Sequence, residues 1–287
     1  MIRSPIALAF WGLGIAGGTG IAYMLGAGAP THLPAINAGA IVVAMALVWV
    51  RARRQPTPPA GMTIAIGVSV ALLATALFGH EVEGIRRWWS IGPVSVNVAL
   101  LALPALAVAY ARRPASAGDR IATTAAMALA ALALALQPDR GSAFALLLVT
   151  LVVGLWRRHA SDWIVLVIAA TAFAATVSRA DPLDGVRFVE GVLAEGWRAS
   201  PGWGPALAAA SAALLLPLTA LPRLPADARL AIVAFSAAIG GLVAASIIGQ
   251  YPTPVVGAGL SAIVGYALGV LMFPRLGPSA MPGADAP

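Results

Sequence analysis

The sequence predicts an all-α polytopic membrane protein with about ten transmembrane helices. Of its 287 residues, 60% are hydrophobic and only 10% are charged, and the mean hydropathy is +0.89. An average soluble domain is about 25% charged, so this chain lacks the polar residues to cover a water-facing surface. Cysteine is absent, which excludes disulfide frameworks, thiolate metal sites and cysteine nucleophiles.

Mostly apolar segments near the length that spans a bilayer, about 20 residues, occur ten times. They lie near 6–25, 35–50, 60–79, 93–111, 121–136, 142–156, 162–178, 205–221, 229–249 and 255–273. The fifth and sixth are short and are separated by one tight turn, so a single re-entrant hairpin is the alternative for this pair. We expect one transmembrane domain over 1–274 and a disordered, Pro/Gly/Ala-rich cytoplasmic tail over 275–287.

The charges predict the orientation of these segments. With the N-terminus placed in the cytoplasm, twelve arginines and four acids fall inside, and six arginines and seven acids fall outside. The net charges are then +8 and −1, which follows the positive-inside rule. Both termini are therefore expected in the cytoplasm, and the net charge of +7 requires no nucleic-acid partner. A signal peptide ending near 27–29 is the alternative for the first segment, disfavoured because nine more segments follow.

Polar residues on the outer side gather in three places, near 80–93, 137–142 and 178–204. Such clusters are the functional signal in a membrane protein, because charged groups are costly in a bilayer. The third and longest loop lies between the seventh and eighth segments. In it, Arg187 and Glu190 are three residues apart, a spacing that places both on one face of a helix, which predicts an amphipathic half-helix at the interface. The alternative is a solvated loop whose charges pair with one another.

Searches for familiar catalytic motifs find none. The three histidines fall on alternating sides of the membrane, and no nucleotide-binding or H-E-x-x-H pattern occurs. Chemistry based on carboxylate and arginine outside the cytoplasm is therefore what the residues favour.

Four segments resemble one known family. Residues 136–143 read L-Q-P-D-R-G-S-A, 83–93 read E-G-I-R-R-W-W-S-I-G-P, 181–183 read D-P-L, and 254–261 read P-V-V-G-A-G-L-S. Their order and spacing are similar to the SEDS family of cell-shape, division and sporulation proteins, typified by RodA and FtsW. The family motifs there are L-Q-P-D-L-G-T-A, R-W-I-x-L-G-P, D-P-x-G and P-F-I-S-Y-G-G-S. This resemblance implies ten spans and a peptidoglycan glycosyltransferase that acts at the outer face of the bacterial cytoplasmic membrane.

The resemblance also implies a site. Asp181, the acid of the D-P motif, is the expected catalytic residue, and lipid II, a glycan precursor on undecaprenyl pyrophosphate, is the expected substrate. The side chains expected to bind the pyrophosphate and sugar are Arg86, Arg87, Arg179, Arg187 and Glu190. The residues expected to support the site structurally are Trp88, Gln137, Asp139 and Pro254. No metal-ligand cluster is visible, although a divalent cation, Mg²⁺ or Mn²⁺, could assist the pyrophosphate.

The expected partners are membrane lipids and a class B penicillin-binding transpeptidase. The chain nevertheless departs from the family pattern, because the family's membrane-embedded P-S-E becomes V-A-L at 98–100 and a stretch resembling L-P-E-x-x-x-D-F-I-F is missing. These losses leave open a non-catalytic SEDS-fold scaffold, or a protein that binds or flips a lipid-linked precursor. A transporter of other solutes is less favoured, because the charges lie at the outer rim instead of the bilayer midplane.

Overall fold

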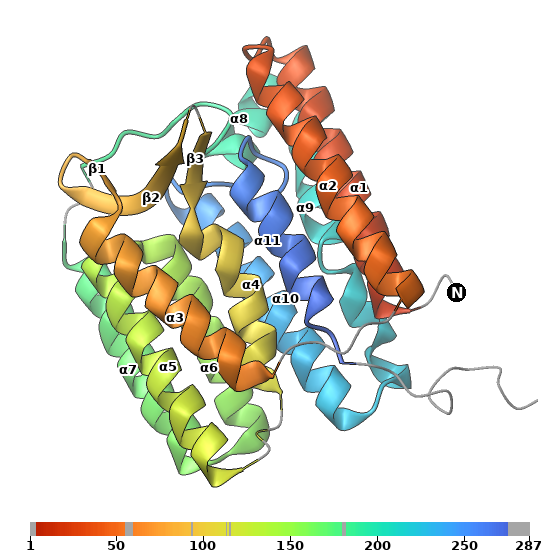
Figure 1. The fold of residues 1–287 in the computed structure, drawn as a ribbon. Coiled ribbons are helices and arrows are strands. Elements are labelled where there is room, and N and C mark those ends of the chain that lie inside the picture. The colour runs from red at the N-terminus through yellow and green to blue at the C-terminus, as the bar shows by residue number, and fades with distance from the viewer. Residues whose placement is uncertain are drawn as a thin grey trace, which may run out of the picture.

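The computed structural model describes residues 4–54, 60–92, 94–112, 114, 116–179 and 182–274. Over these residues the chain forms a bundle of long helices, with a small antiparallel sheet and one short helix at one end, which we call the sheet end (Figure 1). The first helix begins and the last helix ends at the opposite end. The predicted disordered tail lies outside the described residues.

The elements follow the order of the predicted segments closely. Their bounds are α1 (Pro5–Gly26), α2 (His32–Arg54), α3 (Gly61–Phe78), β1 (His80–Val82), β2 (Ile85–Ile91), β3 (Val94–Asn97), α4 (Val98–Ala111), α5 (Ala117–Leu136), α6 (Arg140–Arg157), α7 (Ala160–Val177), α8 (Val192–Ala199), α9 (Trp203–Ala213), the 3-10 helix η1 (Leu216–Arg223), α10 (Ala226–Ile248) and α11 (Leu260–Leu271).

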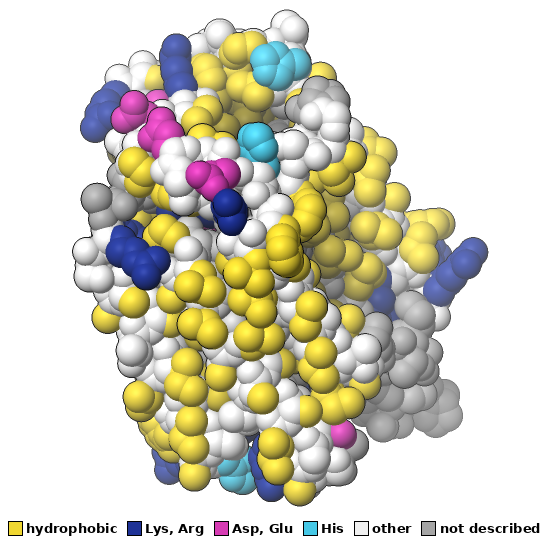
Figure 2. All heavy atoms as spheres, turned by 60° about the vertical axis from the view of Figure 1, so that its left-hand side comes forward, with side chains coloured by type: hydrophobic (Ala, Val, Ile, Leu, Met, Phe, Trp, Pro, Cys, Tyr) yellow, Lys and Arg dark blue, Asp and Glu magenta, His cyan; other side chains and the backbone are white. Residues whose placement is uncertain are grey.

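Eight helical segments of the described chain are long and apolar enough to cross a membrane, with α9 and η1 counted together as one. The remaining two predicted segments form the shorter apolar helices α4 and α11. Helices α5 and α6 have 20 and 18 residues, so each is longer than its predicted window. Figure 2 shows a broad apolar belt between charged side chains at the two ends, as expected for a multi-pass membrane protein.

The sheet is a feature that the sequence analysis missed. Strands β1, β2 and β3 pair antiparallel in that order, through turns in which Glu83, Gly84 and Gly92 have positive φ. Such turns match the twist of paired strands. Because β3 takes residues 94–97, α4 starts at Val98, later than predicted. The all-α prediction holds for the membrane bundle, to which the structure adds one small sheet.

The predicted half-helix in the long loop is wrong in its starting point. Helix α8 begins at Val192, directly after Gly191, which has a φ of 65°. Phe188 also has a φ of 65°, a left-handed conformation that an α-helix does not contain. Arg187 and Glu190 therefore precede the helix and do not share its face.

Helices α2 and α11 are joined at the end opposite the sheet by a buried arginine. Arg51 is only 1% exposed. Its Nε donates to the Leu271 carbonyl oxygen at 3.2 Å, and its Nη2 donates to the Phe273 carbonyl oxygen at 2.7 Å. The last carbonyl groups of a helix have no partner within the helix, and a bilayer offers no water to replace one. Arg51 supplies those partners from the neighbouring helix.

We expect the substitution Arg51→Met to lower the free energy of unfolding in detergent by about 2–4 kcal/mol, because two hydrogen bonds to a charged donor are lost. Thermal unfolding of the purified protein measures this loss. Arg54→Met is the matched control, because Arg54 lies on the same helix and is exposed. Equal melting temperatures for the two variants would contradict the role assigned to Arg51.

Candidate functional site

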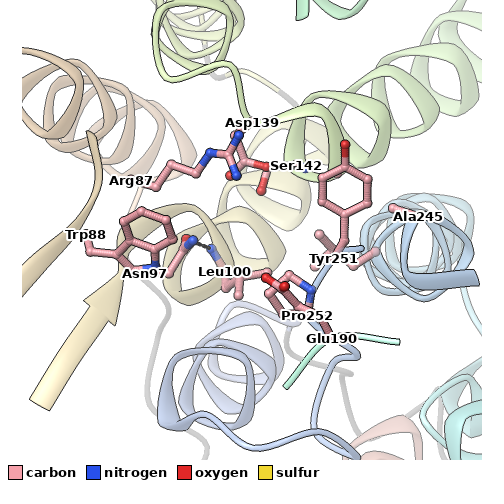
Figure 3. A pocket seen from close by; sticks show the side chains of 12 residues that line it. Arg87, Trp88, Asn97, Leu100, Asp139, Ser142, Glu190, Ala245, Tyr251 and Pro252 are labelled. Atoms are coloured by element: carbon pink, nitrogen blue, oxygen red, sulfur yellow. Dashed lines mark hydrogen bonds between the residues drawn. The ribbon is translucent and has the colours of Figure 1, made fainter. Parts of the chain in front are cut away.

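Two adjoining cavities lie at the sheet end. The larger, of about 350 Å³, is bounded by the start of α2, by β3, by the loops around 186–190 and 252–259, and by the start of α11. We call it the sheet-end cavity. A smaller pocket beside it reaches the start of α6 (Figure 3). The two share the lining residues Trp88, Asn97, Leu100, Glu190 and Pro252.

Arg87 lines the smaller pocket and is 7% exposed. Its Nε donates to the Gln137 carbonyl oxygen at 3.1 Å, and its Nη2 donates to the Pro138 carbonyl oxygen at 2.6 Å. Figure 3 shows the guanidinium group pointing toward Asp139. Arg87 thus ties β2 to the turn between α5 and α6 and places a positive charge in the pocket wall.

The turn between α5 and α6 is held by buried polar side chains. The Asp139 Oδ1 atom accepts from the Ser142 backbone N–H at 3.0 Å and caps α6. The Gln137 Nε2 atom donates to the Leu72 carbonyl oxygen at 2.6 Å, which joins the turn to α3. An aspartate at the N-cap position, directly before the first helical residue, is a favourable cap. These two side chains therefore fix the position of the turn beside the pocket.

The sheet-end cavity is mainly apolar, with a few buried polar groups. Asn97 caps α4 by accepting from the Leu100 N–H at 2.9 Å, and its own backbone N–H donates to the Ser261 Oγ atom at 3.0 Å. Asn37 and Thr253 are further buried polar residues of the lining. An apolar cavity with few, well-placed polar groups suits a ligand that has both an apolar and a hydrogen-bonding part.

Glu190 lies where the two cavities meet. Its Oε2 atom accepts from the Val186 N–H at 3.0 Å, and its backbone forms a bridge with Pro252. The side chain is partly exposed. A carboxylate in this place is able to accept a hydrogen bond from the hydroxyl group of a ligand.

The other arginines predicted to bind substrate lie at the sheet end but outside both cavity linings. Arg86 is exposed and forms an ion pair with Glu81 at 2.7 Å. The Arg187 guanidinium carbon lies 4.6 Å from the ring centre of Phe188, and the Arg179 Nη1 atom donates to the Ala135 carbonyl oxygen. Of the predicted arginines that the structure describes, Arg87 is the one that lines a cavity.

Asp181, the predicted catalytic residue, lies outside the described residues. Pro254 is buried within the loop that bounds the sheet-end cavity, and its carbonyl oxygen accepts from the Val256 N–H at 2.7 Å. Pro254 is therefore near the cavity without lining it.

Both asparagines of the chain, Asn37 and Asn97, line the sheet-end cavity, and neither is among the predicted site residues. Each lies in or beside a predicted apolar segment. An amide side chain in an apolar membrane segment costs free energy unless it is hydrogen-bonded. The presence of an asparagine in such a segment was therefore the signal that could have marked both residues as site candidates.

Comparison with known proteins shows the fold. No family model matches the chain, and no curated protein matches it. Among solved structures, the rod shape determining protein RodA of Thermus thermophilus matches with 20% identity and a TM-score of 0.54, over 93% of this chain and 92% of that one. A mutant of that RodA gives the same values. A chain from a peptidoglycan synthase complex, described as coordinating polymerization and crosslinking, matches with 20% identity and a TM-score of 0.52, over 93% and 94%. The predicted likeness to RodA is confirmed for the fold.

We expect Arg87→Met to lower the free energy of unfolding by about 2–5 kcal/mol, because it leaves buried carbonyl groups without donors. Arg86→Met is the matched control: it removes the neighbouring arginine, whose ion pair with Glu81 and hydrogen bond to the Leu77 carbonyl oxygen are both exposed and are expected to contribute about 0–1 kcal/mol. Thermal unfolding and amide exchange over 137–142 measure the difference. If both variants unfold alike and 137–142 stays equally protected, Arg87 does not hold the turn.

Proposed function

We propose that this chain is a SEDS-type glycosyltransferase that polymerises glycan strands from lipid II at the outer face of the bacterial cytoplasmic membrane. The observation that carries this proposal is that three of the four motif segments, 83–93, 136–143 and 254–261, contribute residues to the lining of two adjoining cavities. Residues from β2 and the start of α4, from the α5–α6 turn, from the loop after Asp181 and from the segment before α11 line the two adjoining cavities. The RodA-like fold over 93% of the chain supports the same function.

The proposed reaction is a displacement at an anomeric carbon. The 4-hydroxyl oxygen of an acceptor sugar forms a bond to the anomeric carbon of a lipid-linked glycan, and the bond from that carbon to the pyrophosphate oxygen breaks, with inversion. The hydroxyl proton passes to a carboxylate base, and undecaprenyl pyrophosphate leaves. We assign the base to Asp181, and general-base catalysis of this kind contributes about 10²–10⁴-fold.

The leaving pyrophosphate requires positive charge, and Arg87 is the arginine that we place closest to it. Arginine suits this role because its planar fork binds phosphate oxygens at two points. Arg86, Arg179 and Arg187 serve as further cations around the entrance, and Glu190 binds a sugar hydroxyl. A Mg²⁺ or Mn²⁺ ion would bind mainly through the pyrophosphate oxygens, as is usual for Mg²⁺ at phosphate groups.

We propose a class B penicillin-binding transpeptidase as the partner that crosslinks the new strands. The likeness to a chain from a peptidoglycan synthase complex, which coordinates polymerization and crosslinking, supports this choice. Polymerisation at the outer face and crosslinking by this partner both require the sheet end to lie outside the cytoplasm.

A second candidate function is favoured by one specific observation. Leu100 lines both cavities, in the segment where the family motif carries an embedded acid. An apolar side chain there supplies no proton acceptor or metal ligand. A non-catalytic relative, which binds or flips a lipid-linked precursor or serves as a scaffold, is therefore the alternative.

The catalytic assignment predicts that Asp181→Ala lowers glycan polymerisation by about 10²–10⁴-fold, because the general base is lost. The measurement is the formation of glycan ladders from fluorescent lipid II by the purified protein, with and without a transpeptidase partner. Asp184→Ala is the control, since Asp184 is an exposed acid three residues away. Ladders that persist in Asp181→Ala would rule out this base, and their absence even from the wild type would favour the non-catalytic alternative.

The orientation is testable by thiol labelling, because the chain has no cysteine of its own. His80 in β1 and His159 before α7 are both exposed and lie at opposite ends of the bundle. In intact spheroplasts, a membrane-impermeant maleimide should label His80→Cys and spare His159→Cys until the cells are broken. The reverse pattern would place the sheet end in the cytoplasm.

A further inference from the structure

Two loops that bound the sheet-end cavity are hydrogen-bonded to each other. The Thr253 N–H donates to the Val189 carbonyl oxygen at 3.0 Å, and the Ala258 N–H donates to the Phe188 carbonyl oxygen at 2.6 Å. The Glu190–Pro252 bridge extends the same pairing. We call residues 186–191 and 251–259 the paired loops. Together they carry Glu190 and much of the cavity wall.

Both loops contain a residue in an unfavourable backbone conformation. Val255 has a φ of 66° and Phe188 has a φ of 65°. Left-handed conformations are uncommon for bulky residues and rare for β-branched ones. They persist only where the surrounding structure fixes them, and they occur often at functional sites. The paired loops therefore need an external support.

Asn37 of α2 supplies such a support from across the cavity. Its Nδ2 atom donates to the Gly257 carbonyl oxygen at 2.9 Å, and its Oδ1 atom accepts from the Gly259 N–H at 2.9 Å. The side chain is completely buried and also belongs to the cavity lining. One carboxamide thus fixes the backbone on both sides of Ala258, whose N–H holds the other loop.

Helix α2 holds Asn37 in place because its side chains are hydrogen-bonded near both ends of α11. Asn37 binds the backbone just before α11 begins, and Arg51 binds the carbonyl oxygens where α11 ends. Any shift of α2 along α11 would break both contacts. The position of the paired loops is therefore set by the α2–α11 pair.

We propose that Asn37 is a positioning residue of the site: through Gly257 and Gly259 it fixes the paired loops, and with them Glu190, in the geometry that binds the lipid-linked sugar. This inference rests on the proposed function. It assigns to α2, which carries none of the motif segments, an indirect influence on the reaction. The carboxamide acts through the backbone that it holds.

The test compares Asn37→Ala with Ser69→Ala in the full-length protein. Ser69 is a suitable control, because its Oγ atom also makes a fully buried contact, to the Ala126 carbonyl oxygen of α5, away from the cavity. Two quantities are measured: amide exchange at 257–259, and kcat and KM for fluorescent lipid II, corrected for the folded fraction. Asn37→Ser replaces Asn37→Ala if the latter does not fold.

We expect Asn37→Ala to speed amide exchange at 257–259 at least about tenfold and to lower kcat/KM by about 10–100-fold, since small misplacements of positioning groups have effects of this size. Ser69→Ala should change neither quantity by more than about twofold. Unchanged exchange in Asn37→Ala, or faster exchange with unchanged kcat/KM, would overturn the inference. If the wild type neither binds nor polymerises lipid II, the proposed function fails and this inference falls with it.

Discussion

Inside a bilayer, a polar group has to find its partner within the protein, because no water is present to replace one. Most side chains of this protein are apolar and need no hydrogen-bond partner. Three polar side chains of the bundle bond to backbone groups of other elements: Arg51 to the end of α11, Asn37 to its start, and Gln137 to α3. These contacts are few, and each joins segments that are far apart in the sequence.

The same constraint explains why the candidate site lies at the sheet end. Polar groups are cheaper near the membrane surface, and here they converge on two adjoining cavities. Arg87 brings a charge into the wall because the α5–α6 turn offers carbonyl oxygens that need donors. The cavity remains mostly apolar, with asparagine, serine and threonine side chains in its lining, and this combination matches the lipid and sugar parts of the proposed substrate.

The sequence predicted the apolar segments well, because hydropathy over about 20 residues is a strong signal. It did not predict the sheet, since R-R-W-W before a helix resembles an interfacial anchor as much as a strand. Without the strand, the different surroundings of Arg86 and Arg87 were not predictable. Side chains of neighbouring strand residues point to opposite faces, so Arg86 is exposed and Arg87 is buried. The role of Asn37 was also out of reach, because its partners lie 220 and 222 residues away.

The proposed function requires the sheet-end cavity to bind a lipid-linked glycan precursor. This binding is tested most directly with a lipid II analogue that carries a photoreactive group on its sugar, in proteoliposomes, followed by mass-spectrometric mapping of the crosslinked peptides. Binding in this cavity should give crosslinks within 88–100, 182–198 or 250–262, and these should disappear when unlabelled lipid II is added in excess. Crosslinks confined to the outward-facing surfaces of α5 and α7, or unaffected by unlabelled lipid II, would contradict it.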